Sequence, residues 1–198
     1  MNNNLNTELL CTRLSHDIIG NIGAVANAVE LLEEGDMDFM EDIKSILKTS
    51  SQTLAARLKF FRMAFGLNNS NLDDLSVVKQ TAQDYLLTIG NKDFPISLEF
   101  DVKQSKLRKQ ALQMIMVISD IIIRGGNIKV IENEGILTVS ISADTKISTD
   151  KLLKVEQALY SNQIIEASLA PLAALMTNEF NRRIILQRTD TEIKLISE

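Results

Sequence analysis

The sequence predicts an α+β fold in which an N-terminal antiparallel helical hairpin precedes an α/β sandwich. Two observations predict it. Residues 7–66 contain no proline, and their apolar side chains recur at the spacing of one face of a helix. Beyond the polar stretch 67–72, shorter segments with alternating or helical patterns are separated by turn-forming residues. We therefore expect a hairpin domain over residues 1–67 and a second domain over residues 72–198.

The hairpin is expected to consist of two helices of roughly 27 residues, each about 40 Å long at about 1.5 Å per residue. Thr7 is a candidate cap for the first helix, which ends at Gly35. Asp36 or Asp38 can cap the second helix, which ends near Gly66. The short connection makes the two helices antiparallel.

The apolar stripe of the first helix predicts a partner for the hairpin. It continues along the whole helix, through Leu14, Ile18, Ile22, Val25, Val29 and Leu32. A hairpin cannot bury such stripes on both helices by itself, whereas two hairpins can pair as a four-helix bundle. We therefore expect a homodimer formed through residues 7–66. The alternative is that the hairpin packs against its own second domain.

The second domain is expected to hold about five mostly antiparallel strands with helices on one face. The predicted strands are residues 96–101, 127–132, 136–142, 181–187 and 191–196, with hairpin turns at 133–135 and 189–190. The predicted helices are residues 73–89, 105–123, 149–160 and 162–179, the last kinked or divided by Pro171.

Composition excludes several classes of function. One histidine and one cysteine cannot supply the three or four ligands of a His/Cys zinc site, nor can one cysteine form an intrachain disulfide. The net charge of −5, from 21 basic and 26 acidic residues, argues against nucleic-acid binding. The first ten residues lack the pattern of a secretory signal, and Asp120 interrupts the longest apolar stretch, which is shorter than a membrane span. We expect a soluble cytoplasmic protein that binds neither nucleic acid nor membranes.

The only histidine, His16, is expected to face away from the core. At about 100° per residue, it lies roughly 160° from the apolar stripe of its helix. Arg13, Gly20, Gly23 and Asn27 share this exposed face. Glycine costs about 1 kcal/mol relative to alanine inside a helix, so two of them beside His16 suggest a shallow patch for another protein's backbone. The alternatives are an idle surface histidine, and glycines that contact the second domain.

Small and basic residues are expected at the level of His16 on the second helix. Pairing the helices about residues 35 and 36 places Ala55 and Ala56 there, and Arg57, Lys59 and Arg62 follow toward the same end. Basic groups around an exposed nucleophile suit a phosphate-bearing or acidic partner, although ordinary helix-surface charge is the alternative for each. Neutral imidazole can attack phosphorus and hold the phosphoryl group covalently, and the adjacent Asp17 could orient the ring.

Residues 10–35 resemble the phosphoacceptor helix of ChpT-type histidine phosphotransferases. The matching positions are Arg13, Leu14, His16, Asp17, Asn27, Glu30, Leu31 and Leu32. More weakly, the whole chain resembles a dimeric sensor-kinase core whose ATPase domain has degenerated. The resemblance implies that His16 is the phosphoacceptor and Asp17 its acidic neighbour. The chain departs from related helices by carrying Gly20 and Asn21 where a polar residue and proline often follow the histidine, so no kink is expected.

The distribution of glycine argues against ATP binding. Kinase-type ATPase domains need an asparagine-bearing helix and later glycine-rich loops, because glycine lets the backbone approach phosphates closely. The candidate helix at 111–126 has no asparagine, and no glycine lies between residues 136 and 198. A phosphotransferase is therefore favoured over an ATP-dependent kinase with a divergent nucleotide loop.

We interpret the chain as a histidine phosphotransferase that relays a phosphoryl group between receiver-domain aspartates through phosphohistidine at His16. The expected partners are receiver domains of response regulators or of a hybrid histidine kinase. They would dock on a surface comprising Arg13, Gly20, Gly23, Asn27, Ala55, Ala56, Lys59 and Arg62. No cofactor or metal is expected on this chain, and Mg²⁺ is expected on the receiver. The alternative is a non-catalytic dimeric adaptor that binds response-regulator or kinase partners.

Overall fold

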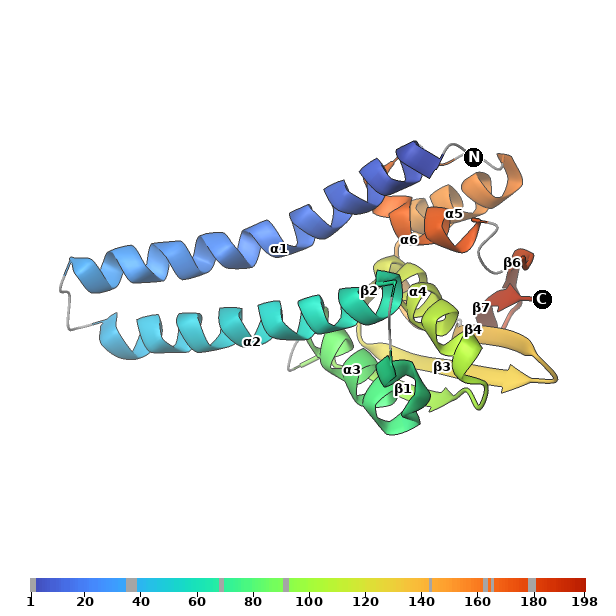
Figure 1. The fold of residues 1–198 in the computed structure, drawn as a ribbon, viewed down its shortest axis with the longest axis horizontal. Coiled ribbons are helices and arrows are strands. Elements are labelled where there is room, and N and C mark those ends of the chain that lie inside the picture. The colour runs from blue at the N-terminus through green and yellow to red at the C-terminus, as the bar shows by residue number, and fades with distance from the viewer. Residues whose placement is uncertain are drawn as a thin grey trace.

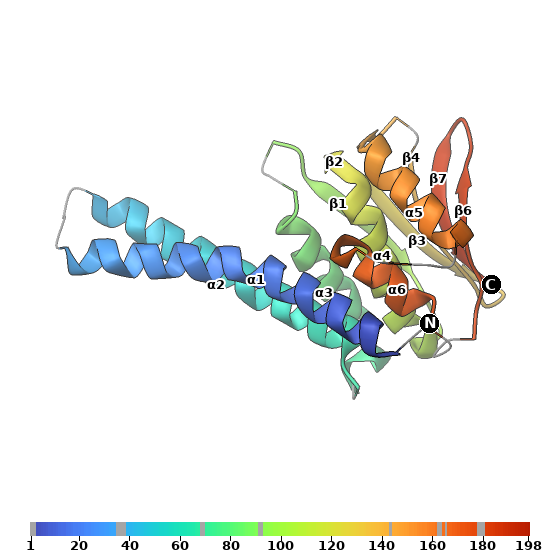
Figure 2. The same ribbon diagram turned by 90° about the horizontal axis from the view of Figure 1, so that it is seen from above.

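Two long helices lie side by side and project from a body in which a sheet is covered by helices (Figures 1 and 2). The computed structural model describes residues 3–34, 39–67, 70–90, 93–142, 144–161, 164, 166–177 and 181–198. Helix α1 spans Asn3–Glu33 and helix α2 spans Met40–Phe65. The protein therefore has the predicted α+β class, with an antiparallel hairpin at its N-terminal end.

The ends of the hairpin helices only partly follow the expected caps. Thr7 does not cap α1, because the helix already begins at Asn3 and Thr7 lies within it. Gly66 follows α2 as predicted, and its N–H donates to the carbonyl of Arg62 at 2.9 Å. The expected caps at residues 35, 36 and 38 lie outside the described residues.

The body is built on a mixed five-stranded sheet in the order β1-β3-β4-β7-β6. Its strands are β1 (Ile96–Asp101), β3 (Gly126–Asn133), β4 (Ile136–Ser142), β6 (Ile184–Arg188) and β7 (Glu192–Ser197). Only the β1–β3 pairing is parallel, so the expected count and the mostly antiparallel pairing are confirmed. A short second pair, β2 (Ile122–Arg124) with β5 (Lys146–Ile147), was not predicted.

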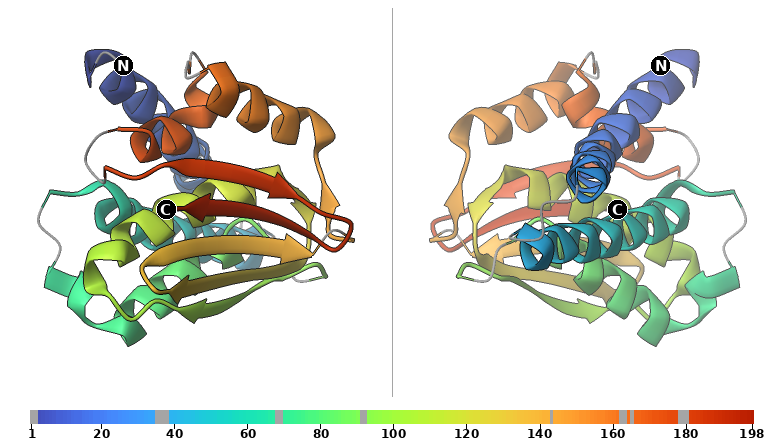
Figure 3. Two further views of the ribbon diagram at one scale, coloured as in Figure 1. Left: turned by 90° about the vertical axis from the view of Figure 1, so that its right-hand side faces the viewer. Right: turned by 90° about the vertical axis from the view of Figure 1, so that its left-hand side faces the viewer.

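All the helices that the structure describes, the hairpin included, lie on one side of the main sheet, and none of them covers its other face (Figure 3). After the 3₁₀ turn η2 (Ser70–Asp73), the helices of the body are α3 (Leu75–Leu87), α4 (Ser105–Ile121), α5 (Thr149–Ser161) and α6 (Ala170–Leu175), with η3 (Ala167–Leu169) before α6. Residues alternate between buried and exposed along β1, and between half-buried and buried along β7, as expected for a sheet with one covered face.

The predicted helix over residues 162–179 is wrong in extent. The described part of this segment contains only η3 and the six-residue α6, and Pro171 stands in the first turn of α6 instead of kinking a longer helix. The physical reason is that proline's fixed φ and missing N–H suit the start of a helix. The predicted turn at 133–135 is confirmed, since Glu134 and Gly135 both have positive φ, 49° and 81°.

Helix α4 lies between the sheet and the hairpin, which explains why nearly all of its faces are buried (Figure 1). An aromatic cluster attaches the end of the hairpin to α3. The rings of Phe60 and Tyr85 stack with centroids 3.9 Å apart, and Phe61 packs edge-on against both. This cluster fixes the C-terminal end of α2 on the body, while the N-terminal part of α2 and the C-terminal part of α1 project away from it (Figure 2).

Candidate functional site

His16 lies near the middle of α1, and its side chain is 87% exposed. This position agrees with the placement of the ring opposite the apolar stripe. The Nδ1 atom of His16 faces its sequence neighbour Asp17, with 3.6 Å between Nδ1 and Oδ1. That separation is longer than a hydrogen bond, so in this conformation the carboxylate acts on the ring through its charge. The other nitrogen, Nε2, is the one available to a partner.

Asp17 accepts a hydrogen bond from a side chain in the preceding turn of α1. Its side chain is only 15% exposed, and its Oδ2 atom accepts a hydrogen bond of 2.9 Å from Nε of Arg13. The i, i+4 spacing brings these two side chains together on one helix face. One carboxylate oxygen is therefore engaged by Arg13, and the other is directed to the imidazole.

Arg13 connects the hairpin to the body. Its two terminal nitrogens donate to the two carboxylate oxygens of Asp120 in α4, each at 2.7 Å, and Nη1 also donates to the carbonyl of Ser168 in η3 at 3.1 Å. Burial alone would lower the pKa of Arg13, but the hydrogen bonds and charges of Asp120 and Asp17 outweigh burial, and the pKa is raised. The guanidinium is thus a bidentate bridge with a fixed positive charge.

This position of Arg13 corrects the expectation that it shares the exposed face of His16. Its side chain is 14% exposed and its donors are committed within the chain. The helical wheel describes α1 in isolation, whereas η3 and α4 cover α1 at this level. Arg13 therefore supports the site from inside instead of presenting a free basic group to a partner.

Asp120 is the acidic residue that the sequence reasoning did not assign to the site. It is 21% exposed, and burial is the main cause of a pKa raised above the ordinary aspartate value, against the opposing effect of Arg13. Lys151 of α5 donates to the backbone carbonyl of Asp120 at 3.0 Å. The signal that could have found Asp120 is its isolation as the only charge in residues 112–123.

A second arginine approaches the turn that carries His16. Nη1 of Arg57 in α2 donates to the backbone carbonyl of Asp17 at 2.6 Å. Its Nε and Nη2 atoms donate to the side-chain and backbone oxygens of Thr88, at 3.2 and 3.3 Å. Arg57 therefore ties α1 and α2 to the end of α3, and it brings positive charge close to the acidic neighbour of His16.

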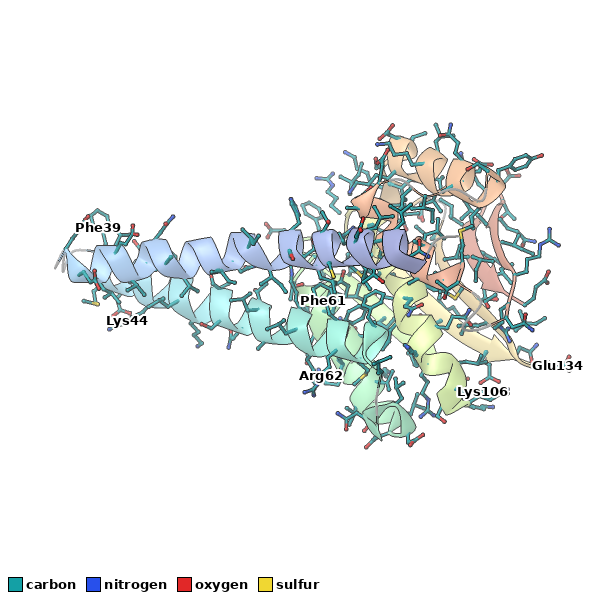
Figure 4. The ribbon with its side chains drawn as sticks, turned by 45° about the horizontal axis from the view of Figure 1, so that its top comes forward. Phe39, Lys44, Phe61, Arg62, Lys106 and Glu134 are labelled. Atoms are coloured by element: carbon teal, nitrogen blue, oxygen red, sulfur yellow. The ribbon has the colours of Figure 1, made fainter. Side chains whose placement is uncertain are left out.

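Most of the other predicted docking residues are accessible. A side-chain carbon added at Gly20 or at Gly23 would meet nothing within 4 Å, so these glycines do not serve a close contact with the body of the same chain. Asn27, Ala55, Lys59 and Arg62 are exposed and Ala56 is half-buried. Figure 4 shows Arg62 at the end of α2 near the body, with Phe39 and Lys44 at the other end of α2, away from the body.

A groove of about 620 Å³ runs between α2 and α3 beside this surface. Ala55, Ala56 and Lys59 line it from α2, while Asp84, Leu87 and Thr88 line it from the α3 side. Thr88 also accepts the hydrogen bonds of Arg57, so the groove adjoins the turn that carries His16. The structure therefore brings Ala55, Ala56 and Lys59 into one concave surface, and Arg62 lies outside its lining.

Metal-ligating clusters and membrane-spanning helices are both absent from the described residues. Within the described ranges, no group of three or more His, Cys, Asp or Glu side chains is placed to hold a metal ion. In the same part of the chain, no helix has the length and apolar character needed to cross a membrane.

Comparison with known proteins connects the chain to phosphotransferases. No protein-family model matches it. It is 50% identical to the protein phosphotransferase ChpT of Brucella abortus (strain 2308) over 62 residues, which are 31% of this chain and 29% of that protein. It also resembles a solved structure described as a bacterial phosphotransferase at 1.7 Å, with a TM-score of 0.74 and 26% identity over 100% of this chain and 98% of the other. The sequence match to ChpT supports the resemblance that residues 10–35 indicate, and the structural match is to a protein described as a phosphotransferase.

Proposed function

We propose that this protein is a histidine phosphotransferase in a phosphorelay, with His16 as the residue that carries the phosphoryl group. The observation that supports this most directly is the combination of an 87% exposed imidazole with a carboxylate facing its Nδ1 atom. The similarity to proteins named as phosphotransferases supports the same class of reaction.

The proposed reaction consists of two displacements at phosphorus. A receiver domain carrying phosphoaspartate docks on the hairpin, and Nε2 of His16 attacks the phosphorus in line. The bond between phosphorus and the aspartate oxygen breaks, and the receiver keeps its free carboxylate. The receiver supplies the Mg²⁺ that stabilises the transferring charge, and positioning accounts for most of the remaining catalysis. A second receiver's aspartate then attacks the phosphohistidine, and the bond between phosphorus and Nε2 breaks.

Asp17 contributes to these steps through its charge. When a neutral imidazole that carries its proton on Nδ1 forms a bond from Nε2, the ring gains positive charge. A carboxylate beside Nδ1 stabilises that charge and favours the tautomer that leaves Nε2 free to attack. The Oδ1 atom of Asp17 is in position to do this, because Arg13 occupies Oδ2.

The decisive experiment follows labelled phosphate from a phosphorylated receiver domain to this protein and on to a second receiver. We expect the native chain to become labelled and to pass the label on, and His16→Ala to do neither. Cys11→Ala is the control, because Cys11 is an exposed residue of the same helix. Because His16 is the only histidine, phosphohistidine can form only there. Transfer that persists in His16→Ala contradicts the proposal, and receiver binding without transfer by the native chain identifies the adaptor alternative.

We also propose that the active form is a homodimer in which two hairpins pair. Several apolar residues of the hairpin are exposed in the single chain, among them Ile22 at 52%, Val29 at 42% and Leu58 at 51%. Their position on helices that project from the body supports a helix-on-helix interface. Val29→Lys should convert the dimer to a monomer in sedimentation experiments, whereas Ile131→Lys, at a similarly exposed strand residue, should not. A native chain that is monomeric at micromolar concentration would refute this interface.

A further inference from the structure

Three charged side chains form a continuous path from the body of the protein to His16. Asp120 accepts both terminal nitrogens of Arg13, Arg13 donates its Nε–H to Asp17, and Asp17 faces Nδ1 of His16. The path crosses from α4 to α1, so one end belongs to the body and the other to the helix with the proposed phosphoacceptor. The proposed mechanism uses Asp17 and His16 but leaves Asp120 without a role.

The geometry points to Asp120 as a positioning residue for His16, and this inference rests on the proposed function. We infer that Asp120 holds the terminal nitrogens of Arg13, so that Asp17 keeps one carboxylate oxygen and most of its negative charge for the imidazole.

The hydrogen-bonding geometry of Arg13 supports this role of Asp120. A guanidinium prefers to form two parallel hydrogen bonds with one carboxylate. In this structure Arg13 makes that bidentate contact with Asp120, at 2.7 Å on both sides, and gives only Nε–H to Asp17. Without a charged group at residue 120, Asp17 is the carboxylate within reach. Arg13 would then pair with Asp17 on both oxygens and withdraw it from His16.

The count of charges leads to the same conclusion. Asp17, Arg13 and Asp120 together carry one net negative charge, whereas replacing Asp120 by a neutral residue leaves Asp17 and Arg13 with none. Two other cations lie close, with Arg57 donating to the backbone carbonyl of Asp17 and Lys151 to that of Asp120. With these two cations counted, the five groups carry one net positive charge, and a neutral residue in place of Asp120 would raise it to two. The carboxylate of Asp120 therefore offsets part of the positive charge around the imidazole, which favours the Nδ1–H tautomer and stabilises the ring charge that develops on transfer.

The test compares Asp120→Asn with the native chain in a measurement that needs no receiver. The ¹⁵N chemical shifts of the imidazole report which nitrogen carries the proton, and with a single histidine the signals are unambiguous. Phosphoramidate serves as a simple phosphodonor: Nε2 attacks its phosphorus, the P–N bond breaks and ammonia leaves. We expect Asp120→Asn to contain less of the Nδ1–H tautomer and to be phosphorylated on the order of tenfold more slowly. This decrease in rate is smaller than the one expected when a group that itself transfers a proton is removed.

Matched variants separate positioning from a general structural effect. Asp101→Asn removes a carboxylate from β1 at an exposed residue and should change neither the tautomer nor the rate. Asp17→Asn should decrease the fraction of Nδ1–H tautomer at least as much as Asp120→Asn does. Asp120→Glu keeps the charge, so it should retain the native tautomer and most of the rate, and it also serves as the test if Asp120→Asn does not fold.

Two results would overturn the inference: a folded Asp120→Asn protein with the native tautomer and rate, or an Asp120→Glu protein as slow as Asp120→Asn. Failure of the proposed function gives a different result. If His16 of the native chain accepts phosphate from phosphoramidate but exchanges it with no receiver, the relay function fails and the role of Asp120 stands. If phosphoramidate does not label His16, the tautomer measurement alone decides.

Discussion

Arg108 of α4 makes a buried contact that should control how the hairpin is joined to the body. Its side chain is 6% exposed, and its guanidinium donates to the carbonyls of Leu72 and Asp73 in η2, both at 2.8 Å. It also donates to the carbonyls of Val102 and Lys103 before α4, at 3.0 and 2.9 Å. These bonds hold the segment after α2 against α4, so Arg108→Met should loosen the connection between the two units.

The expected loss of stability follows from the backbone carbonyl oxygens that Arg108→Met leaves without a donor. Each lost hydrogen bond costs about 1 kcal/mol, and water can reach part of η2, so we expect a net loss near 3 kcal/mol. For a protein of this size that corresponds to a melting temperature lower by roughly 6–12 °C. Thermal and urea unfolding at fixed protein concentration measure the change. Lys106→Met is the control, because Lys106 is exposed on the same helix (Figure 4). A loss below about 0.5 kcal/mol, or one equal to that of Lys106→Met, would refute the reasoning.

Further predictions concern the ion pair and the glycines. A double-mutant cycle with Arg13→Met and Asp120→Asn should give a coupling of about 1–2 kcal/mol in urea unfolding, and additive effects would contradict the bridge. Burial raises the pKa of Asp120, so the folded state retains a proton that the unfolded state releases. The contribution of Asp120 to the free energy of unfolding should therefore be greatest below the ordinary aspartate pKa and should be lost as pH rises through the pKa of Asp120 in the folded state. In unfolding experiments at a series of pH values, Asp120→Asn should remove this dependence of stability on pH. Gly20→Ala should stabilise α1 by about 1 kcal/mol in thermal unfolding, since the site is open, yet slow transfer from a receiver. Gly126→Ala should destabilise by about 1–3 kcal/mol, because φ is +133° and the added carbon would lie 2.9 Å from Thr145; unchanged unfolding would contradict the strain.

The sequence predicted the long helices and the main strands because their signals are local. The helical period of α1 and α2 and the alternation along β1 depend on which face of a single element is buried. The length of α6 was not predicted, because proline is compatible both with a kink and with a helix start, and only the surrounding chain decides between them. The two-residue strand β5 is too short to show any period.

The candidate site was predictable only where it depends on one helix. The exposure of His16 followed from its angle to the apolar stripe. The antiparallel pairing placed Arg57 close to this turn of α1, and in the structure Arg57 donates to the carbonyl of Asp17. The role of Arg13 did not, because its partner Asp120 is 107 residues away in the chain and lies on a helix that was considered only for nucleotide binding. A wheel drawn for α1 cannot show that another element covers part of its polar face.

Helix α4 explains why the body matters to a site that lies on the hairpin. Along its length, Arg108 holds η2, Gln113 donates to the carbonyl of Ala64 near the end of α2 at 2.7 Å, and Asp120 holds α1 through Arg13. One buried helix thus contacts both hairpin helices and the segment that follows them. A tilt of the hairpin would have to break at least one of these contacts, and the contact nearest His16 is the one that also sets the charge beside it. The body therefore fixes the direction of the hairpin and the electrostatic surroundings of the imidazole through the same helix.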